Sequence, residues 1–498
     1  FASEESAGEY CATLFSVVAI SLLVSWILSV TVTPLQCMGM LKPQGASGAD
    51  PFDNRFFNGF RALLHTAIRF RFVSIGIAVV VLVASLASFG SVTKLFFPDA
   101  AMTKFMVDYW MPEGTRIERT SADIEKIDAH LRADPRIAEV ATFVGAGPPR
   151  FYLPVEPEAA NPAYGQLVVN VHDMKDIDGI IADLQPWVLE NFPTALIPIR
   201  KFTVGPGDTW KFELRISGPG NADPTVLRNL GNEVLAIVRQ SPYAGLMQTD
   251  WRQEVLEVRP EYNTARASWA GITREDIART TRRTYDGLPM GLFRDGDELV
   301  PIVMRHVNDE RERPGDIDVL PVRGAASTKS VPMAQVVDGV PVAPQESVIA
   351  RYDRKRTLTV QANPALGFTF PTLYADVKAK IETLALPPGY SVEWGGEQEN
   401  SSKSQASLLP GAVPALAITV FIMIALFNAL RPPLVIAMTI PFALSGVIFG
   451  LLITGVPFGF VALLAAMSLA GMMIKNGLVL LDEINAGLAN GLSRYDAT

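Results

Sequence analysis

The sequence predicts an α-helical membrane protein with a large α+β region outside the membrane. Five apolar segments are each long enough to span a bilayer as a helix, which takes about 20 residues. A long polar stretch, 94–407, separates the first two segments from the last three. Hydrophobic residues make up 49% of the chain and charged residues 19%. That mixture is expected when nearly charge-free spans are joined to a water-facing part.

The five segments also predict an orientation. The expected spans are 12–33, 72–93, 408–428, 433–453 and 460–484. Basic residues near span ends mark the cytoplasmic side of a membrane. They occur in the first connection, in the short loop between the third and fourth spans, and after the fifth span, at Lys42, Arg55, Arg61, Arg69, Arg71, Arg431 and Arg494. We therefore expect region 99–400 on the other side.

The segment 52–71 is predicted to be an amphipathic helix. Phe56, Phe60 and Leu63 fall on one helical face, and the arginines lie elsewhere. This pattern is typical of a helix that lies on the cytoplasmic membrane surface. The alternative is a solvated connecting helix.

The outer region alternates strand-like and helix-like runs, which predicts an α+β fold. Repeated β-α-β units of this size suggest ferredoxin-like subdomains, and Pro- and Gly-rich joints near 145–162 and 204–208 indicate loops. Helices are expected at 117–133, 178–191, 222–240, 273–284 and 371–384. Strands are expected at 104–111, 137–145, 164–173, 211–217, 246–251, 254–260, 299–305, 317–323, 357–364 and 390–396.

Lys475 is the most informative single residue. Between 408 and 481 the only other charged residue is Arg431. A cation near the bilayer midplane costs at least a few kcal/mol, so it usually faces the helix bundle and a partner. This favours an ion or proton relay. The alternative is a lysine that extends to the membrane surface. For the adjacent Asn476, a helix-packing hydrogen bond is the simpler interpretation.

Composition and spacing argue against several other classes. The net charge of −8 does not suit a nucleic-acid partner. The four histidines have no metal-site spacing, and no nucleophile–base motif or phosphate loop occurs, so no enzyme is expected. Cys11 and Cys37 flank the first span, roughly 39 Å apart on a helix, too far for a disulfide. The chain starts at Phe1, close to a span, which suggests a piece of a longer protein.

Several motifs, in order along nearly the whole chain, resemble the resistance–nodulation–division (RND) transporters, and most closely their hydrophobe/amphiphile efflux branch. They are VSWILSVTVTPLQCMGMLKP (24–43), LFFPDA (95–100), MPEGT (111–115), WKFELRISGPG (210–220), LEVRPEYNTARASWAGIT (256–273), SVEWGGEQE (391–399) and AGMMIKNGLVLLDEI (470–484).

The resemblance implies a division of the outer region. A first porter subdomain would be 99–208. A second would consist of 209–256 and 345–400, with a docking subdomain, 257–344, inserted in it. The five spans would correspond to the family's sixth to tenth helices. The family's paired aspartates, which would meet Lys475 and Asn476 in the proton relay, lie on a helix outside these five.

The resemblance also implies a role and partners. The chain would be the inner-membrane subunit of a Gram-negative efflux pump, a homotrimer driven by the proton gradient without a cofactor. A periplasmic adaptor and an outer-membrane channel would complete the assembly. The expected substrates are small hydrophobic or amphiphilic compounds such as drugs, detergents and solvents.

Two aromatic groups are candidate substrate contacts under this resemblance. Phe143, Phe151 and Tyr152 surround the loop 145–158, which would separate two drug pockets. Trp210 and Phe212 are two residues apart on an expected strand, so they would face the same side, at the pocket entrance. Ordinary packing is the alternative for each of them.

Two other functions stay open. Met102, Met106 and Met111 lie near one strand and are compatible with a heavy-metal-exporting RND pump, although methionine as a gap-filler is the simpler interpretation. A non-transporting, membrane-anchored scaffold is the third possibility. It would show no coupling between Lys475 and substrate export.

Overall fold

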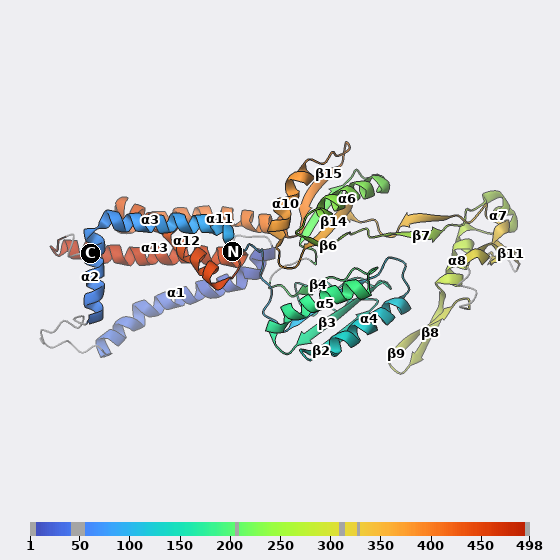
Figure 1. The fold of residues 1–498 in the computed structure, drawn as a ribbon, viewed down its shortest axis with the longest axis horizontal. Helices are drawn as coiled ribbons and strands as arrows, with labels where there is room; N and C mark the ends of the chain where they lie inside the picture. Colours follow the sequence, from blue (N-terminus) through green and yellow to red (C-terminus); the bar gives the residue numbers. More distant parts are fainter. Residues whose placement is uncertain (1–5, 41–54, 205–208, 308–313, 326–328, 494–498) are drawn as a thin grey trace. The chain divides into compact units, whose positions relative to one another are not determined.

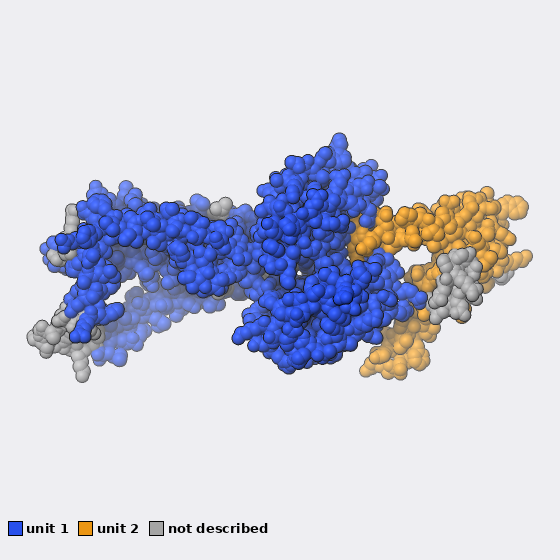
Figure 2. Space-filling view, viewed as in Figure 1, with its two compact units in different colours: residues 1–250, 349–498 blue, residues 251–348 orange. Residues whose placement is uncertain are grey.

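The computed structural model describes residues 6–40, 55–204, 209–307, 314–325 and 329–493. The contacts divide the chain into two compact units (Figure 2). The first consists of Phe1–Asp250 and Ile349–Thr498, and the second is Trp251–Val348. The second unit is therefore an insertion in the first. The stretch 257–344, expected to be a docking subdomain, lies inside its bounds.

Five helices in the described part of the chain are long and apolar enough to cross a membrane. They are α1 (Ser6–Met40), α3 (Arg71–Ser88), α11 (Gly396–Phe427), α12 (Arg431–Thr454) and α13 (Phe460–Ala489) (Figure 1). Each expected span lies largely within one of them, although 72–93 runs past the end of α3. The predicted amphipathic segment contains α2 (Arg55–Arg69), whereas 52–54, Lys42 and Arg494 lie outside the described residues.

The first water-facing subdomain has the element order β-α-β-β-α-β. Its strand order is β2-β3-β1-β4, with all neighbours antiparallel. Helices α4 and α5 pack on one face of the sheet around a core that includes Phe105, Ile124, Leu167 and Leu184 (Figure 1). The elements are β1 (Lys104–Trp110), α4 (Ile117–Arg132), β2 (Ile137–Val144), β3 (Tyr164–Val171), α5 (Ile177–Asn191) and β4 (Ile199–Lys201).

The second subdomain repeats this topology. Its corresponding strands are ordered β6-β14-β5-β15, again antiparallel. The elements are β5 (Phe212–Ser217), α6 (Pro224–Arg239), β6 (Ala244–Thr249), β14 (Lys355–Pro364), α10 (Phe370–Glu382) and β15 (Ser391–Gly395), with β13 (Arg351–Tyr352) beside the start of β14. The connection from β6 to β14 contains the inserted unit, whereas the first subdomain has the loop 145–163 at this point.

The inserted unit has a small core of its own, with Ile272, Ile277, Val322 and Met333 among its members. Its residues 317–323 were expected to form a strand, but only β10 (Pro321–Arg323) does, after a 3-10 helix that ends at Val319. The other elements are β7 (Glu254–Val258), α7 (Thr264–Ala270), α8 (Arg274–Tyr285), β8 (Leu288–Asp295), β9 (Glu298–Met304), β11 (Ser330–Pro332) and β12 (Val342–Glu346).

Candidate functional site

The first subdomain presents two different faces of one sheet. Successive side chains of a strand point to opposite faces. On β1, Phe105, Val107 and Tyr109 therefore enter the core beneath α4 and α5. Met106 and Asp108 point to the opposite face, and Met106 belongs to a separate cluster with Phe202. Among the described residues of this subdomain, no helix lies over this outer face.

Part of the loop 145–163 covers this outer face with aromatic side chains. The Tyr152 hydroxyl donates a hydrogen bond to the Thr203 carbonyl at 2.7 Å. The rings of Tyr152 and Phe151 both meet the buried Phe202 ring edge to face, with centroids 5.3 and 5.9 Å away. Phe151 remains 50% exposed. The structure thus brings together two of the predicted contact residues and adds Phe202, which the sequence analysis missed.

The other predicted contact residues lie elsewhere. Phe143 is half-buried on β2, opposite Gln166 of β3. Phe212 is fully buried on β5 and meets Trp394 edge to face at 5.7 Å. Trp210, just before β5, is 6% exposed. Core packing accounts for the positions of Phe212 and Trp210, and a role for either in substrate contact stays a prediction.

A buried carboxylate lies next to the aromatic cluster. Asp108 is 1% exposed and accepts hydrogen bonds from Tyr164 Oη and Gln166 Nε2, both at 2.8 Å, and from Arg200 Nε at 2.7 Å. A buried charge is tolerated when it is paired and hydrogen-bonded in this way. Burial and the Asp108 carboxylate raise the pKa of Tyr164 above its usual range, so its hydroxyl stays a donor. The network joins β1, β3 and β4.

Lys475 lies on α13, one turn beyond a groove between α12 and α13. The groove measures about 560 Å³, and its apolar lining includes Gly446 and Gly450 on α12 and Ser468 and Met472 on α13. Glycine pairs of this kind suit close helix packing. A Cβ added at either glycine would nevertheless meet no described atom within 4 Å.

Lys475 and Asn476 continue the face of α13 that lines this groove. Residues three or four apart share one face of a helix, and both positions follow Met472 at that spacing. Both side chains are exposed. Within the described residues, neither makes an ion pair or a hydrogen bond through its side chain. Their assignment to a proton relay stays a prediction.

The N-terminal end of α13 is hydrogen-bonded to the chain segment that leads into β1. Phe458 N–H donates to the Thr93 carbonyl at 2.8 Å, and Phe460 N–H to the Phe96 carbonyl at 2.9 Å. A Cβ on Gly459 would lie 2.8 Å from the Leu95 carbonyl oxygen, so this approach requires glycine. Phe96 packs with Phe460 in a small cluster of buried aromatic rings. The helix that carries Lys475 thus contacts the entrance to the first subdomain.

Comparison with known proteins places the chain in a family. The sequence profile of the AcrB/AcrD/AcrF family matches residues 4–498. The nickel and cobalt resistance protein CnrA of Cupriavidus metallidurans is 30% identical over 273 residues, which are 52% of this chain and 24% of that protein. The toluene efflux pump membrane transporter TtgB of Pseudomonas putida is 20% identical over 512 residues, which are 98% of this chain and 47% of TtgB.

A solved structure agrees with the fold. The crystal structure of a heavy metal efflux pump superposes with a TM-score of 0.69 at 20% identity, covering 88% of this chain and 46% of that one. The chain spans about half the length, or less, of these relatives. Its spans and its α+β region are those of this fold, and the profile match extends over nearly the whole sequence. The chain belongs to the AcrB/AcrD/AcrF family of RND efflux transporters.

Proposed function

We propose that this chain exports hydrophobic or amphiphilic compounds and is driven by the proton gradient. It acts as the inner-membrane subunit of a homotrimeric pump with a periplasmic adaptor and an outer-membrane channel. The two β-α-β-β-α-β subdomains are its ferredoxin-like porter subdomains, and 257–344, within unit Trp251–Val348, is its docking subdomain. The reaction is transport and needs no cofactor.

The observation that carries the substrate class is the aromatic cluster on the outer face of the first sheet. Phe151 is half-exposed, Tyr152 is partly buried, and both pack on Phe202. Met102 and Met106 extend the same cluster. Aromatic and thioether groups beside a few polar groups suit apolar ligands of varied shape. Phe151 and Tyr152 lie on a loop, where side chains can adapt to different compounds.

A substrate panel tests this proposal. Phe151→Ala combined with Tyr152→Ala removes both rings but keeps Phe202, which follows β4. We expect resistance of the host cell to fall unevenly, by several-fold for some amphiphiles and little for others. Phe368→Ala is the matched control, because Phe368 is also an exposed aromatic that meets another ring, Tyr243, but in the second subdomain. Equal loss for every compound at normal expression would contradict a pocket on this face.

A metal substrate is the second candidate, because CnrA is named for nickel and cobalt resistance. The described side chains favour it less. Met111 packs in the core on the opposite face from Met106, so the three methionines noted in the sequence do not converge. Asp108 is already engaged by Arg200. The same panel should include nickel, cobalt and zinc salts, and resistance to these salts without resistance to amphiphiles would favour the metal function.

A further inference from the structure

Helix α2 has two chemically different faces, and both are exposed. No residue of α2 is buried. Phe56, Phe60 and Leu63 are 75%, 52% and 65% exposed. At 3.6 residues per turn these three share one side of the helix. The basic residues Arg55, Arg61, His65 and Arg69 occupy the remainder, and segment 55–71 contains no acidic residue.

The join to α3 places α2 at the end of a candidate membrane span. Only Phe70 separates the two helices. Its N–H donates to the Thr66 carbonyl at 3.0 Å, and Ser74 Oγ donates to the Ala67 carbonyl at 3.0 Å across the corner. The following residue, Arg71, is the first of a span that reaches Ser91. Figure 1 shows α2 meeting the start of α3 and running steeply away from it.

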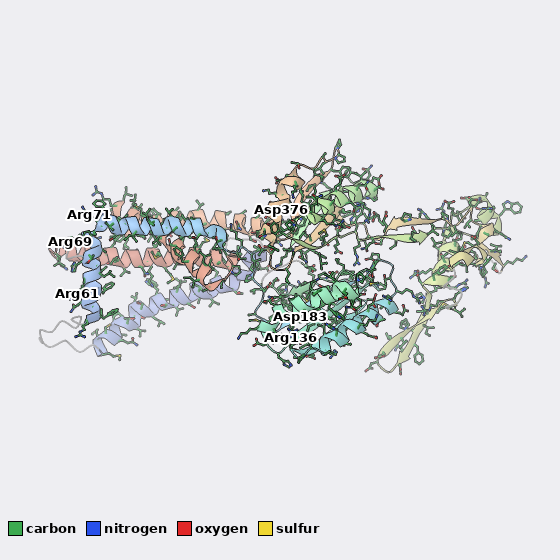
Figure 3. The ribbon with its side chains drawn as sticks, viewed as in Figure 1. Arg61, Arg69, Arg71, Arg136, Asp183 and Asp376 are labelled. Carbon is green, nitrogen blue, oxygen red and sulfur yellow. The ribbon has the colours of Figure 1, made fainter. Side chains whose placement is uncertain are left out.

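The arginines near the corner are suited to phosphate. Figure 3 labels Arg61, Arg69 and Arg71 along α2 and at the start of α3. The guanidinium groups of Arg69 and Arg71 lie 5.9 and 5.1 Å from the ring centroids of Phe70 and Phe72. A planar guanidinium can hold a phosphate through two parallel hydrogen bonds, which a lysine cannot do.

We infer that α2 and Arg71 form a binding surface for the headgroup phosphates of anionic phospholipids. The apolar face of α2 lies in the acyl boundary of the bilayer, and Arg61, Arg69 and Arg71 reach the phosphates. A lipid surface satisfies both faces at once, because it offers an apolar layer next to a layer of negative charge. A soluble acidic partner would satisfy only the basic face and would leave Phe56 and Phe60 in water.

The test measures lipid preference at α2 itself, in the full-length protein. A single cysteine replaces Ala62, an exposed residue between the arginines, after Cys11, Cys37 and every other cysteine of the full-length protein are changed to serine, and it carries a bimane label. The protein is placed in phosphatidylcholine vesicles that contain brominated phosphatidylglycerol or brominated phosphatidylcholine. Quenching of the label then gives the relative association of the two lipids at this helix. The reading needs no transport, so it stands apart from the proposed substrate class.

We expect phosphatidylglycerol to be preferred by roughly tenfold or more, since each basic residue near an anionic surface contributes about fivefold in association. The variant Arg61→Gln, Arg69→Gln, Arg71→Gln should lower this ratio to about 1. The matched variant with lysine at the same positions keeps the charge but loses the paired hydrogen bonds to phosphate, so it should retain only part of the preference. Raised salt should reduce the preference, because it screens exposed charges.

Two outcomes would overturn the inference. One is equal quenching by both lipids in the unchanged protein, or a preference that survives the glutamine changes. The other is no quenching by either lipid, which would place α2 away from the membrane and favour a soluble acidic partner. Elution as a single species and an unchanged unfolding temperature show that each variant is folded. Phe56→Ser with Phe60→Ser should weaken quenching by both lipids alike.

Discussion

The two β-α-β-β-α-β subdomains share a strand order but differ in the sheet face that points away from their helices. In the first, this face holds Met106 and Phe202 beneath the aromatic loop. In the second, it is polar. Glu213 accepts a hydrogen bond from Gln361 Nε2 at 3.0 Å, and Arg215 Nη1 lies 2.5 Å from Glu399 Oε2. One topology therefore presents an aromatic cluster beside the buried Asp108–Arg200 ion pair in one subdomain, and hydrogen-bonded and ion-paired polar side chains in the other.

The polar face of the second subdomain joins it to a membrane helix. Strand β15 ends at Gly395, and α11 begins at the next residue. A Cβ on Gly396 would lie 2.9 Å from the Lys211 carbonyl oxygen, and its φ is +57°, so the junction requires glycine. Glu399 lies in the first turns of α11 and also contacts Lys403 at 2.6 Å. Under the proposed function, the first subdomain makes substrate contact, and the continuous β15–α11 junction transmits movement from the membrane to the second subdomain, in addition to the contact of α13 with the entrance to the first.

The largest expected effect separates energy coupling from substrate contact. Lys475→Met keeps most of the side-chain volume and removes the charge. In the proposed relay, carboxylates on another helix would lose their cation, so proton binding would no longer be coupled to movement of the helices. We expect proton-driven efflux in proteoliposomes to be largely lost for every compound, with ligand affinity largely intact.

Lys475→Arg is the matched control, because it preserves the charge and should retain part of the activity. Near-normal efflux by Lys475→Met would remove the relay role and favour a lysine that extends to the membrane surface. A loss that differs between compounds would place Lys475 in the binding process, together with Phe151 and Tyr152. Lys475 and the aromatic loop would then not have separate roles in proton coupling and substrate contact.

A smaller effect is expected at the junction of the second subdomain. Arg215→Gln leaves Glu399 without its closest cation in a site where both side chains are 16% exposed. Breaking such a partly buried pair should cost about 1–3 kcal/mol, less than a fully buried one. Efflux should fall several-fold and by the same factor for all compounds. A loss of efflux that differs between compounds would show that this sheet face also contacts substrate. The proposed division of roles between the two subdomains would then be wrong.

Two further variants isolate the ion pair. Arg279→Gln on α8 removes an arginine that is 49% exposed and contacts Glu275, so a change of only about 0–1 kcal/mol is expected. Combining Arg215→Gln with Glu399→Gln completes a double-mutant cycle. The double variant should lose less free energy of unfolding than the sum of the losses of the two single variants, because no unpaired charge remains.

The sequence predicted the membrane helices and most of the alternating strands and helices, since both depend on local pattern. The expected third span starts at 408, whereas α11 starts at Gly396. Hydropathy detects only the apolar part of a helix, and 396–407 is polar. Strand β4 was missed because a strand of three residues is too short to show an alternation of apolar and polar residues. Its pairing with β1 depends on tertiary contacts. Strand β8 was missed because Pro289 and Gly291 interrupt its pattern.

The candidate site was predicted only in part. Aromatic residues beside a Gly- and Pro-rich loop pointed to Phe151 and Tyr152. Phe202 and the Asp108 network were not found, since each depends on contacts between residues far apart in the sequence. Asp108 meets Arg200 across 92 positions. One signal was present for one partner only: Asp108 lies within the expected strand 104–111, where an unpaired buried charge would be costly.

The smallest expected effect concerns acid stability of the first subdomain. Hydrogen bonds from Arg136 hold the pKa of the Asp134 carboxyl below its usual range. Arg136 Nη2 lies 2.6 Å from Asp134 Oδ2 and 2.7 Å from Asp183 Oδ2. The second contact joins the start of β2 to α5. A carboxyl with a lowered folded-state pKa stabilises the fold above its unfolded pKa, near 4. That contribution is lost as the pH falls through the lower, folded-state pKa.

Asp134→Asn should therefore destabilise this corner at neutral pH by an amount that shrinks below about pH 4. Hydrogen exchange of peptides that cover 130–140 measures it. The protection difference between the unchanged protein and the variant should narrow as the pH falls. The second subdomain should show no change, because it makes no contact with this ion pair. The Asp134 Oδ1 also accepts the Arg136 N–H at 2.9 Å, a bond that an asparagine side chain can keep. If this turn alone mattered, the variant and the unchanged protein would show the same protection at every pH, and a difference that is constant with pH would show that the charge of Asp134 is not what stabilises this corner.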